Sequence, residues 1–210
     1  MFPRRNLLAG LGVASLAALG AHAATPVAVP KAAARRPRIP NVELKTHTGK
    51  TVRFYDDLVR GKVVTINMMY ALCNASCPPM TRNLVQVQEL LGTRVGKDIF
   101  MYSLTLRPEQ DSPEDLAHYA KLHGVKPGWL FLTGTLPDIE RLRYALGFYD
   151  PDPAVDGEAT RHLGMVRIGN DAFDRWGMAP SLGAPEQIVS AIRHVDRRTG
   201  LNAVGARRAT

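Results

Sequence analysis

The sequence has no long apolar run and little aromatic character. No stretch stays apolar for the roughly 18 residues that a membrane-spanning helix needs, so we expect that the body of the protein does not cross a membrane. Aromatic residues make up only 7% of the chain, and its basic clusters lack the interleaved aromatic side chains of a nucleic-acid surface. No internal repeat is present. These absences argue against a transmembrane body, nucleic-acid binding and a repeat architecture.

Cysteine is scarce as well, with two residues in a chain of 210. A chain of this length suffices for one domain with a substantial core and is not obviously long enough for two. Its 45% hydrophobic and 22% charged residues are ordinary for a globular protein. The sequence therefore predicts one folded domain.

The first 23 residues have the form of an export signal. Arg4 and Arg5 precede an apolar, uncharged run from Leu7 to Gly20, which ends in the small-x-small sequence Ala21 to Ala23. The arginine pair followed by Asn6 and two leucines resembles a twin-arginine signal; a plain Sec signal is the alternative. Either signal predicts a periplasmic protein. If the signal stays uncleaved, the protein would be anchored to the inner membrane and face the periplasm.

Composition divides the chain into four regions. They are an export signal (1–23), an extended linker rich in Ala, Pro and Arg (24–40), the folded domain (41–197) and a basic C-terminal tail (198–210). The formal net charge is +8, but the basic residues cluster only beside the signal and near the C-terminus. We interpret these clusters as solvated tails, or as an aid in approaching an acidic partner or a membrane surface.

Apolar periodicity in the folded region predicts alternating strands and helices. The expected strands are a hairpin (Val42–Thr46 and Thr51–Phe54), three buried strands (Val63–Met69, Ile99–Leu106 and Trp129–Thr133) and a second hairpin (Met165–Ile168 and Ala172–Trp176). Four helices are expected. The first ends at Gly92, the second opens at Ser112, the third starts from a cap at Thr135, and the last contains Ile188, Ile192 and Val195. Because helices connect partly parallel strands, the predicted class is α/β: a central mixed sheet with helices on both faces and an N-terminal hairpin.

Both cysteines, Cys73 and Cys77, fall where the third strand gives way to a helix. Backbone N–H groups and the dipole at a helix N-terminus favour the thiolate, the form that attacks disulfides and binds metals. A separation of four residues places two side chains on one face of a helical turn, close enough to share a metal ion or to form a reducible disulfide. A structural disulfide is the alternative, although so short a loop would add little stability.

Several motifs together resemble the SCO/SenC family, from Gly61 to about Val195. They are the sequence Cys-x-x-x-Cys-Pro at 73–78 followed by a helix, Pro-Glu-Gln-Asp-Ser-Pro at 108–113 after a strand, Phe-Leu-Thr-Gly-Thr at 131–135, and the lone His162 opening a hairpin strand. Each motif alone would be a weak signal. Their combination is specific and covers most of the chain that follows the signal.

This resemblance implies a thioredoxin-like fold in which Cys73, Cys77 and His162 bind one copper ion. Two thiolates and one imidazole form a soft ligand set, which suits Cu(I) and tolerates Cu(II). The family delivers copper to the dinuclear copper site of cytochrome c oxidase subunit II, and some members look more like thiol reductants for the cysteines of that site. The implied partners are therefore subunit II or another copper-accepting protein, and thiol-disulfide partners.

Two arginines depart from the family pattern. Arg107 and Arg161 stand where the family commonly has aspartate, before Pro108 and before His162. We expect both to lie near the cysteine pair and to lower its thiolate pKa, because a nearby cation favours the charged form. Such cations would stabilise a negatively charged complex of two thiolates with Cu(I), and would equally assist metal-free redox chemistry.

Two other functions stay open at the level of the sequence. The first is a thiol-disulfide oxidoreductase that uses Cys73 and Cys77 without metal. Typical oxidoreductases of this fold have two residues between the cysteines and a facing cis-proline, whereas this chain has three and no proline between Pro153 and Pro180. The second is a thioredoxin-like interaction module with a structural disulfide. The sequence favours a copper-binding assembly protein over an enzyme.

Overall fold

The computed structural model describes residues 39–73, 75–156 and 164–196. The strands are β1 (Glu43–Thr46), β2 (Thr51–Arg53), β3 (Val63–Met69), β4 (Ile99–Thr105), β5 (Trp129–Thr133), β6 (Met165–Asn170) and β7 (Arg175–Pro180). The α-helices are α1 (Cys77–Leu91), α2 (Pro113–Leu122), α3 (Leu136–Leu146), α4 (Pro153–Asp156) and α5 (Pro185–Asp196). Shorter helical turns are η1 (Phe54–Val59), η2 (Gly92–Arg94) and η4 (Asp171–Phe173).

Within the described residues, the strands form one mixed sheet of seven in the order β2-β1-β5-β4-β3-β6-β7. β3, β4 and β5 are parallel, and the remaining neighbours are antiparallel. All residues of β3 are buried, as its apolar sequence predicts for a strand covered on both faces. The carboxyl end of this central strand is therefore the point from which the cysteine-containing segment leaves the sheet.

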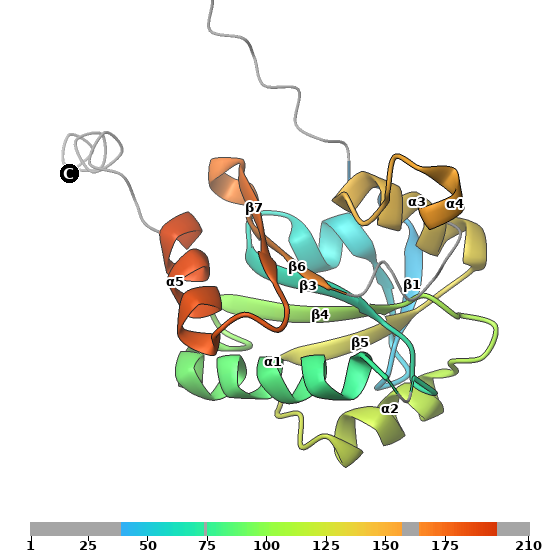
Figure 1. The fold of residues 1–210 in the computed structure, drawn as a ribbon, viewed down its shortest axis with the longest axis horizontal. Coiled ribbons are helices and arrows are strands. Elements are labelled where there is room, and N and C mark those ends of the chain that lie inside the picture. The colour runs from blue at the N-terminus through green and yellow to red at the C-terminus, as the bar shows by residue number, and fades with distance from the viewer. Residues whose placement is uncertain (1–38, 74, 157–163, 197–210) are drawn as a thin grey trace, which may run out of the picture. The chain divides into compact units, whose positions relative to one another are not determined.

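Helices cover both faces of the sheet (Figure 1). α1, α2 and α5 lie on one face, where the Asn170 side-chain amide of β6 donates to the Val195 carbonyl of α5 at 3.1 Å. η1 and α3 lie on the other face, where the Tyr102 hydroxyl of β4 donates to the Leu58 carbonyl of η1 at 2.9 Å. The predicted α/β class, with a mixed sheet and an N-terminal hairpin, is confirmed.

The helix boundaries follow the capping residues that the sequence indicates. The Ser112 hydroxyl accepts the Asp115 N–H at 3.2 Å, and the Asp115 carboxylate accepts the Ser112 N–H at 3.0 Å, which forms a capping box at the start of α2. The Thr135 hydroxyl accepts the Asp138 N–H at 3.3 Å at the start of α3. Gly147 ends α3 with a left-handed φ of 84°. These local signals alone place both helices in the sequence.

The second strand of the C-terminal hairpin begins later than predicted. The sequence predicts a strand over Ala172–Trp176, but this is wrong, because η4 occupies the beginning of that segment and the strand is β7. The buried Asp171 carboxylate accepts the Gly61 N–H at 2.8 Å, which holds the turn against the start of β3. Asp174 then adopts a left-handed φ of 51° and redirects the chain. A long-range hydrogen bond thus fixes this boundary.

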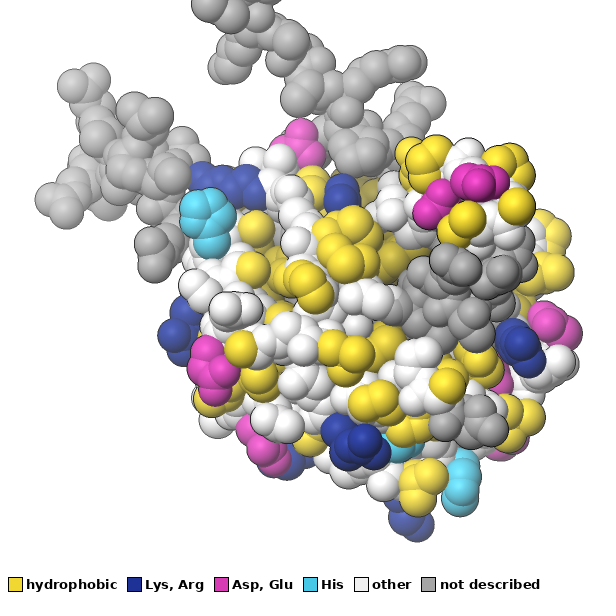
Figure 2. Space-filling model, in the orientation of Figure 1, with side chains coloured by type: hydrophobic (Ala, Val, Ile, Leu, Met, Phe, Trp, Pro, Cys, Tyr) yellow, Lys and Arg dark blue, Asp and Glu magenta, His cyan; other side chains and the backbone are white. Residues whose placement is uncertain are grey.

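The surface carries no strong single-sign charge on the face shown in Figure 2. Acidic and basic side chains of the described residues are scattered over this face, without a broad area of one sign. Such a distribution does not form the basic stripe of a nucleic-acid-binding face. Among the residues described here, no helix is long and apolar enough to cross a membrane.

Candidate functional site

The two cysteines lie beyond the carboxyl end of β3, where the chain enters α1. Cys77 is the first residue of α1, and Cys73 lies in the loop before it, so the prediction of one shared helical turn is wrong for Cys73. Pro78 and Pro79 occupy the first turn of the helix, where a missing N–H costs little. The cysteines are still adjacent, because the Cys77 N–H donates to the Cys73 Sγ at 3.3 Å.

Both cysteines are buried and are free thiols. The exposed fraction is 5% for Cys73 and 0% for Cys77, whereas the neighbouring Leu72 is 77% exposed. Both cysteines belong to the hydrophobic core, and Cys73 is the slightly less buried of the two.

The environment of Cys73 stabilises its thiolate. Burial by itself raises the pKa of this thiol, but hydrogen bonds from the Cys77 thiol and N–H, the Tyr70 hydroxyl and the Ala75 N–H outweigh it, so that the pKa lies below the ordinary thiol value. The Cys77 N–H belongs to the first turn of α1, so part of this effect is the predicted anion preference of a helix N-terminus. Of the two thiols, Cys73 is therefore the one whose thiolate its surroundings favour.

The environment of Cys77 acts in the opposite direction. Burial in the core raises the pKa of the Cys77 thiol far above its ordinary value, and hydrogen bonding to Cys73 and the charges of Cys73 and Asp111 raise it further. In the metal-free pair the pKa values of the two thiols are therefore shifted in opposite directions. A cation bound between them would favour release of the Cys77 proton, because it offsets the negative charge that burial disfavours.

A buried carboxyl group that the sequence analysis did not single out supports the loop before Cys73. Asp111 is 1% exposed, accepts the Ala71 N–H at 3.0 Å and accepts the Thr105 hydroxyl. Burial raises the pKa of Asp111 above its ordinary value. The signal that could have found it is its place in the Pro-x-x-Asp-Ser-Pro motif directly after β4.

Arg107 lies on the same rim of the sheet as the cysteine loop, as predicted. The Leu106 N–H donates to the Met69 carbonyl at 2.8 Å, which brings the ends of β3 and β4 together. The Arg107 guanidinium lies 4.5 Å from the centre of the Tyr70 ring, and the Tyr70 hydroxyl interacts with Cys73. Arg107 therefore contacts a residue that itself interacts with Cys73. A direct effect of Arg107 on the thiolate pKa stays a prediction.

Comparison with known proteins decides the family. The sequence profile of the SCO1/SenC family matches residues 32–196, which is most of the chain. The chain belongs to the SCO1/SenC family. The SCO1 protein homolog of Bacillus subtilis (strain 168) is 30% identical over 87 residues, which are 41% of this chain and 44% of that protein. This match thus spans less than half the length of that curated relative.

Solved structures of SCO1/SenC proteins share the fold of this chain. A SCO1/SenC lipoprotein from Bacillus anthracis has a TM-score of 0.59 at 20% identity, covering 74% of this chain and 93% of that one. Yeast Sco1 with copper bound has a TM-score of 0.59 at 18% identity, covering 76% of this chain and 92% of that one. The predicted thioredoxin-like fold is confirmed by these likenesses.

In this SCO1/SenC protein the proposed third ligand, His162, and its neighbour Arg161 lie outside the described residues. Within the part of the chain that the structure describes, no three His, Cys, Asp or Glu side chains gather to hold a metal ion. The His47 Nδ1 accepts the Phe131 N–H at 3.0 Å, so that nitrogen is already occupied. His123 packs on the Tyr119 ring, with 4.3 Å between ring centres. The two adjacent thiols are the soft donors that suit Cu(I).

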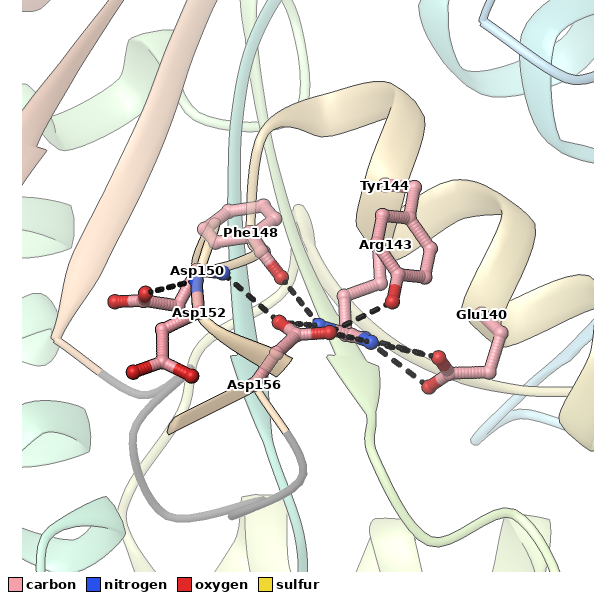
Figure 3. A network of polar contacts seen from close by, with 7 residues as sticks. All are labelled: Glu140, Arg143, Tyr144, Phe148, Asp150, Asp152 and Asp156. Carbon is pink, nitrogen blue, oxygen red and sulfur yellow. Dashed lines mark hydrogen bonds and ion pairs between the residues drawn. The ribbon is translucent and has the colours of Figure 1, made fainter. Parts of the chain in front are cut away.

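A buried ion pair fixes the chain before the His162 segment of this SCO1/SenC protein (Figure 3). Arg143 of α3 donates to both carboxylate oxygens of Asp156, at 2.7 and 2.9 Å, and to the Phe148 carbonyl at 3.0 Å. It also donates to both Glu140 oxygens, and Asp156 accepts the Tyr144 hydroxyl at 2.6 Å. The network ties α4 to α3 directly before residue 157. The sequence analysis missed it because its members lie on separate elements.

Proposed function

We propose that this protein binds one copper ion per chain through Cys73, Cys77 and His162, and that it matures the dinuclear copper site of cytochrome c oxidase subunit II. The carrying observation is the pair of adjacent thiols at the start of α1, in which the Cys77 N–H donates to Cys73 Sγ. Family membership and the copper-bound structure of yeast Sco1 support the proposal.

The ligand set explains why copper is the metal proposed. Two thiolates are soft donors and hold Cu(I), while an imidazole nitrogen from His162 adds the ligand that Cu(II) favours. Copper is the cargo of this site, to be passed to a receiving protein.

The N-terminal region supports action outside the cytoplasm. We propose that residues 1–23 direct export to the periplasm by a twin-arginine-like signal, and that residues 24–40 form a linker to the folded domain at 41–197. In the alternative, an uncleaved signal anchors the domain to the inner membrane. The proposed partners are subunit II or another copper-accepting protein, and thiol-disulfide partners.

A second candidate function is thiol-disulfide exchange without metal, and the opposed pKa shifts of the two thiols favour it. The Cys73 thiolate would attack a disulfide of the target, forming a mixed disulfide and releasing one target thiolate. Cys77 would then lose its proton and attack the Cys73 sulfur, releasing the second target thiol and leaving a Cys73–Cys77 disulfide. The target gains two electrons, which the two cysteines lose.

Copper retention separates the two functions. The reduced protein is equilibrated with one equivalent of Cu(I) or Cu(II), desalted and assayed for bound copper. We expect about one copper per chain in the parent and none in a Cys73→Ala/Cys77→Ala variant, because the soft donors are gone. His47→Ala serves as the matched control, since the Nδ1 of this histidine already accepts the Phe131 N–H. Undiminished copper in the double variant would overturn the proposal, and no copper in the parent would favour metal-free exchange.

A further inference from the structure

Arg167 is a partly buried cation on β6 with an unused hydrogen-bond donor. Its Nε atom is buried and has no hydrogen-bond partner among the described residues, and the side chain forms no ion pair with any of them. Burial lowers the pKa of Arg167 below its ordinary value, and no acid in this part of the chain offsets that effect. A buried donor without a partner is costly, because it has lost its bonds to water. The free Nε of Arg167 therefore indicates a ligand that the described residues do not supply.

Three apolar side chains lie on the same face of the hairpin as Arg167. Arg167 pairs with Met178 and Gly169 pairs with Trp176, and the side chains of directly paired residues share a face. Met165, two positions before Arg167, lies on this face as well. All four side chains are partly exposed. We call the surface formed by Met165, Arg167, Trp176 and Met178 the hairpin face.

Gly169 lets the Trp176 indole lie directly on the sheet beside Arg167. A Cβ atom at this glycine would lie 2.1 Å from the Trp176 ring, which is closer than atoms can approach. The Arg167 guanidinium lies 5.6 Å from the centre of the ring, within the range at which an indole attracts a cation. The indole therefore holds the guanidinium in place before any ligand binds, which lowers the entropy that binding costs.

The hairpin face lies on the side of the sheet that carries η1, at the β7 edge (Figure 1). Arg167 is in register with Ile66 of β3 and Ile66 with Tyr102 of β4. The Tyr102 hydroxyl bonds to η1, which identifies the side. The helix α5 bonds to β6 through Asn170, on the opposite side of the sheet. The hairpin face is therefore not covered by α5.

We infer that the hairpin face binds a segment of a partner protein that presents a carboxylate beside an apolar side chain. The carboxylate pairs with the Arg167 guanidinium, whose planar fork matches it, and the apolar side chain packs on Trp176 and Met178. Neither cysteine belongs to this face, so the inference does not rest on the proposed function.

Charge and residue type both favour this occupant. The strands β6 and β7 contain no Asp or Glu, and the two acids of the turn between them, Asp171 and Asp174, form no ion pair with Arg167. A carboxylate must therefore come from outside this hairpin. Tryptophan, methionine and arginine are enriched at the centres of protein interfaces, and the hairpin face combines all three.

Two capped peptides serve as probes. Ac-Gly-Leu-Glu-Leu-Gly-NH2 carries one carboxylate between two leucines, and the same peptide with Gln in place of Glu keeps the shape without the charge. NMR titration of the full chain follows the Arg167 Nε–H and the Trp176 indole N–H. We expect both signals to shift with the Glu peptide, while the Trp129 indole N–H, bonded to Ser103 in the core, stays in place. The Gln peptide should bind about tenfold or more weakly, because it lacks the charge-assisted bond.

Arg175→Met is the matched control for Arg167→Met. Arg175 is on the same hairpin but pairs with Asn170, whose side chain bonds to α5, so Arg175 starts from the opposite face. Arg167→Met should weaken binding of the Glu peptide by about tenfold or more, and Arg175→Met should leave it unchanged. Arg167→Lys keeps the charge and loses the fork, and should also weaken binding. The melting temperature of each variant shows whether it is folded.

The Glu peptide must prefer the parent chain for the inference to stand. No shift at millimolar Glu peptide, equal affinities for the two peptides, or equal losses in Arg167→Met and Arg175→Met would overturn it. Sodium acetate that binds as tightly as the Glu peptide would overturn the apolar contact and identify a site for free carboxylates. Self-association of the parent in sedimentation, lost in Arg167→Met, would overturn the choice of occupant and identify a second copy of this chain.

Discussion

Cys73 and Cys77 are the same residue type, and their environments shift their pKa values in opposite directions. Hydrogen bonds from the Cys77 N–H, Tyr70 and Ala75 outweigh burial at Cys73, whereas burial dominates at Cys77. The Cys73 thiol therefore loses its proton more readily than an ordinary thiol, and the Cys77 thiol less readily. This difference between the two thiols is compatible with copper binding and with thiol-disulfide exchange.

At the scale of single residues, we predict that iodoacetamide modifies Cys73 before Cys77 in the metal-free reduced protein. Because the pKa of Cys73 is lowered and that of Cys77 is raised, the alkylation rate of Cys73 should rise at a lower pH than that of Cys77. Peptide mass spectrometry at a series of pH values identifies the modified residue. Equal modification of both cysteines at every pH would contradict the assignment.

Tyr70→Phe and Arg107→Asp separate a hydrogen bond from a charge at Cys73. Removing the Tyr70 hydroxyl should raise the midpoint of the alkylation profile, since the thiolate loses a hydrogen-bond donor that stabilises it. Arg107→Asp should raise this midpoint by a smaller amount, because the Arg107 guanidinium contacts the Tyr70 ring and not the cysteines themselves. A larger shift for Arg107→Asp would show that its charge acts directly on the thiolate.

At the scale of elements, α3 and α4 are joined by a charged contact inside the molecule. The exposed fraction of the side chain is 5% for Arg143 and 9% for Asp156, so removing one partner leaves the other charge buried. Hydrogen bonds from Arg143 hold the pKa of Asp156 below its ordinary value. The stability that the pair contributes is therefore fully present above the ordinary carboxyl pKa of about 3.9, and is lost as the pH falls through the lower folded-state value.

We predict that Arg143→Met lowers the free energy of unfolding by roughly 3 kcal/mol at neutral pH, as expected when one partner of a buried ion pair is removed. Urea denaturation followed by circular dichroism measures this change. Arg94→Met is the control, because Arg94 pairs with Asp196 at 2.6 Å with both side chains about one-third exposed, and its loss should cost about 1 kcal/mol or less. Similar losses of unfolding free energy in both variants would show that burial of the Arg143–Asp156 pair adds nothing to stability.

At the scale of the whole molecule, the folded domain is preceded by a segment with the features of an export signal. We predict that Arg4→Lys/Arg5→Lys abolishes export if the route is twin-arginine, because that route needs the guanidinium pair and not merely positive charge. The amount of protein in the periplasmic fraction is the measurement. A chain that begins at residue 24 gives the control for leakage. Undiminished export of the lysine variant would identify a Sec signal and leave the periplasmic assignment intact.

The local features of this protein were predictable from the sequence. The helical spacing of apolar residues indicates α1, because a helix with one buried face has apolar residues every three or four positions. The alternation of predicted strands and helices indicates the α/β class. Ser112 and Thr135 predict helix starts, because a cap bonds to the backbone only three residues away. The junction that holds both cysteines follows from the same local signals, as does the family resemblance.

Only the tertiary structure determined how the site is built. The shift of β7 depends on Asp171 meeting Gly61, and the support of the cysteine loop depends on Asp111 meeting Ala71. The Asn83 side-chain amide of α1 donates to the Ser181 carbonyl in the turn before α5, and these residues are 98 positions apart in the sequence. Local sequence patterns do not predict such contacts, because a hydrogen bond between distant residues depends on how the whole chain folds. The opposed thiol pKa values have the same origin, since burial is a property of the packed molecule.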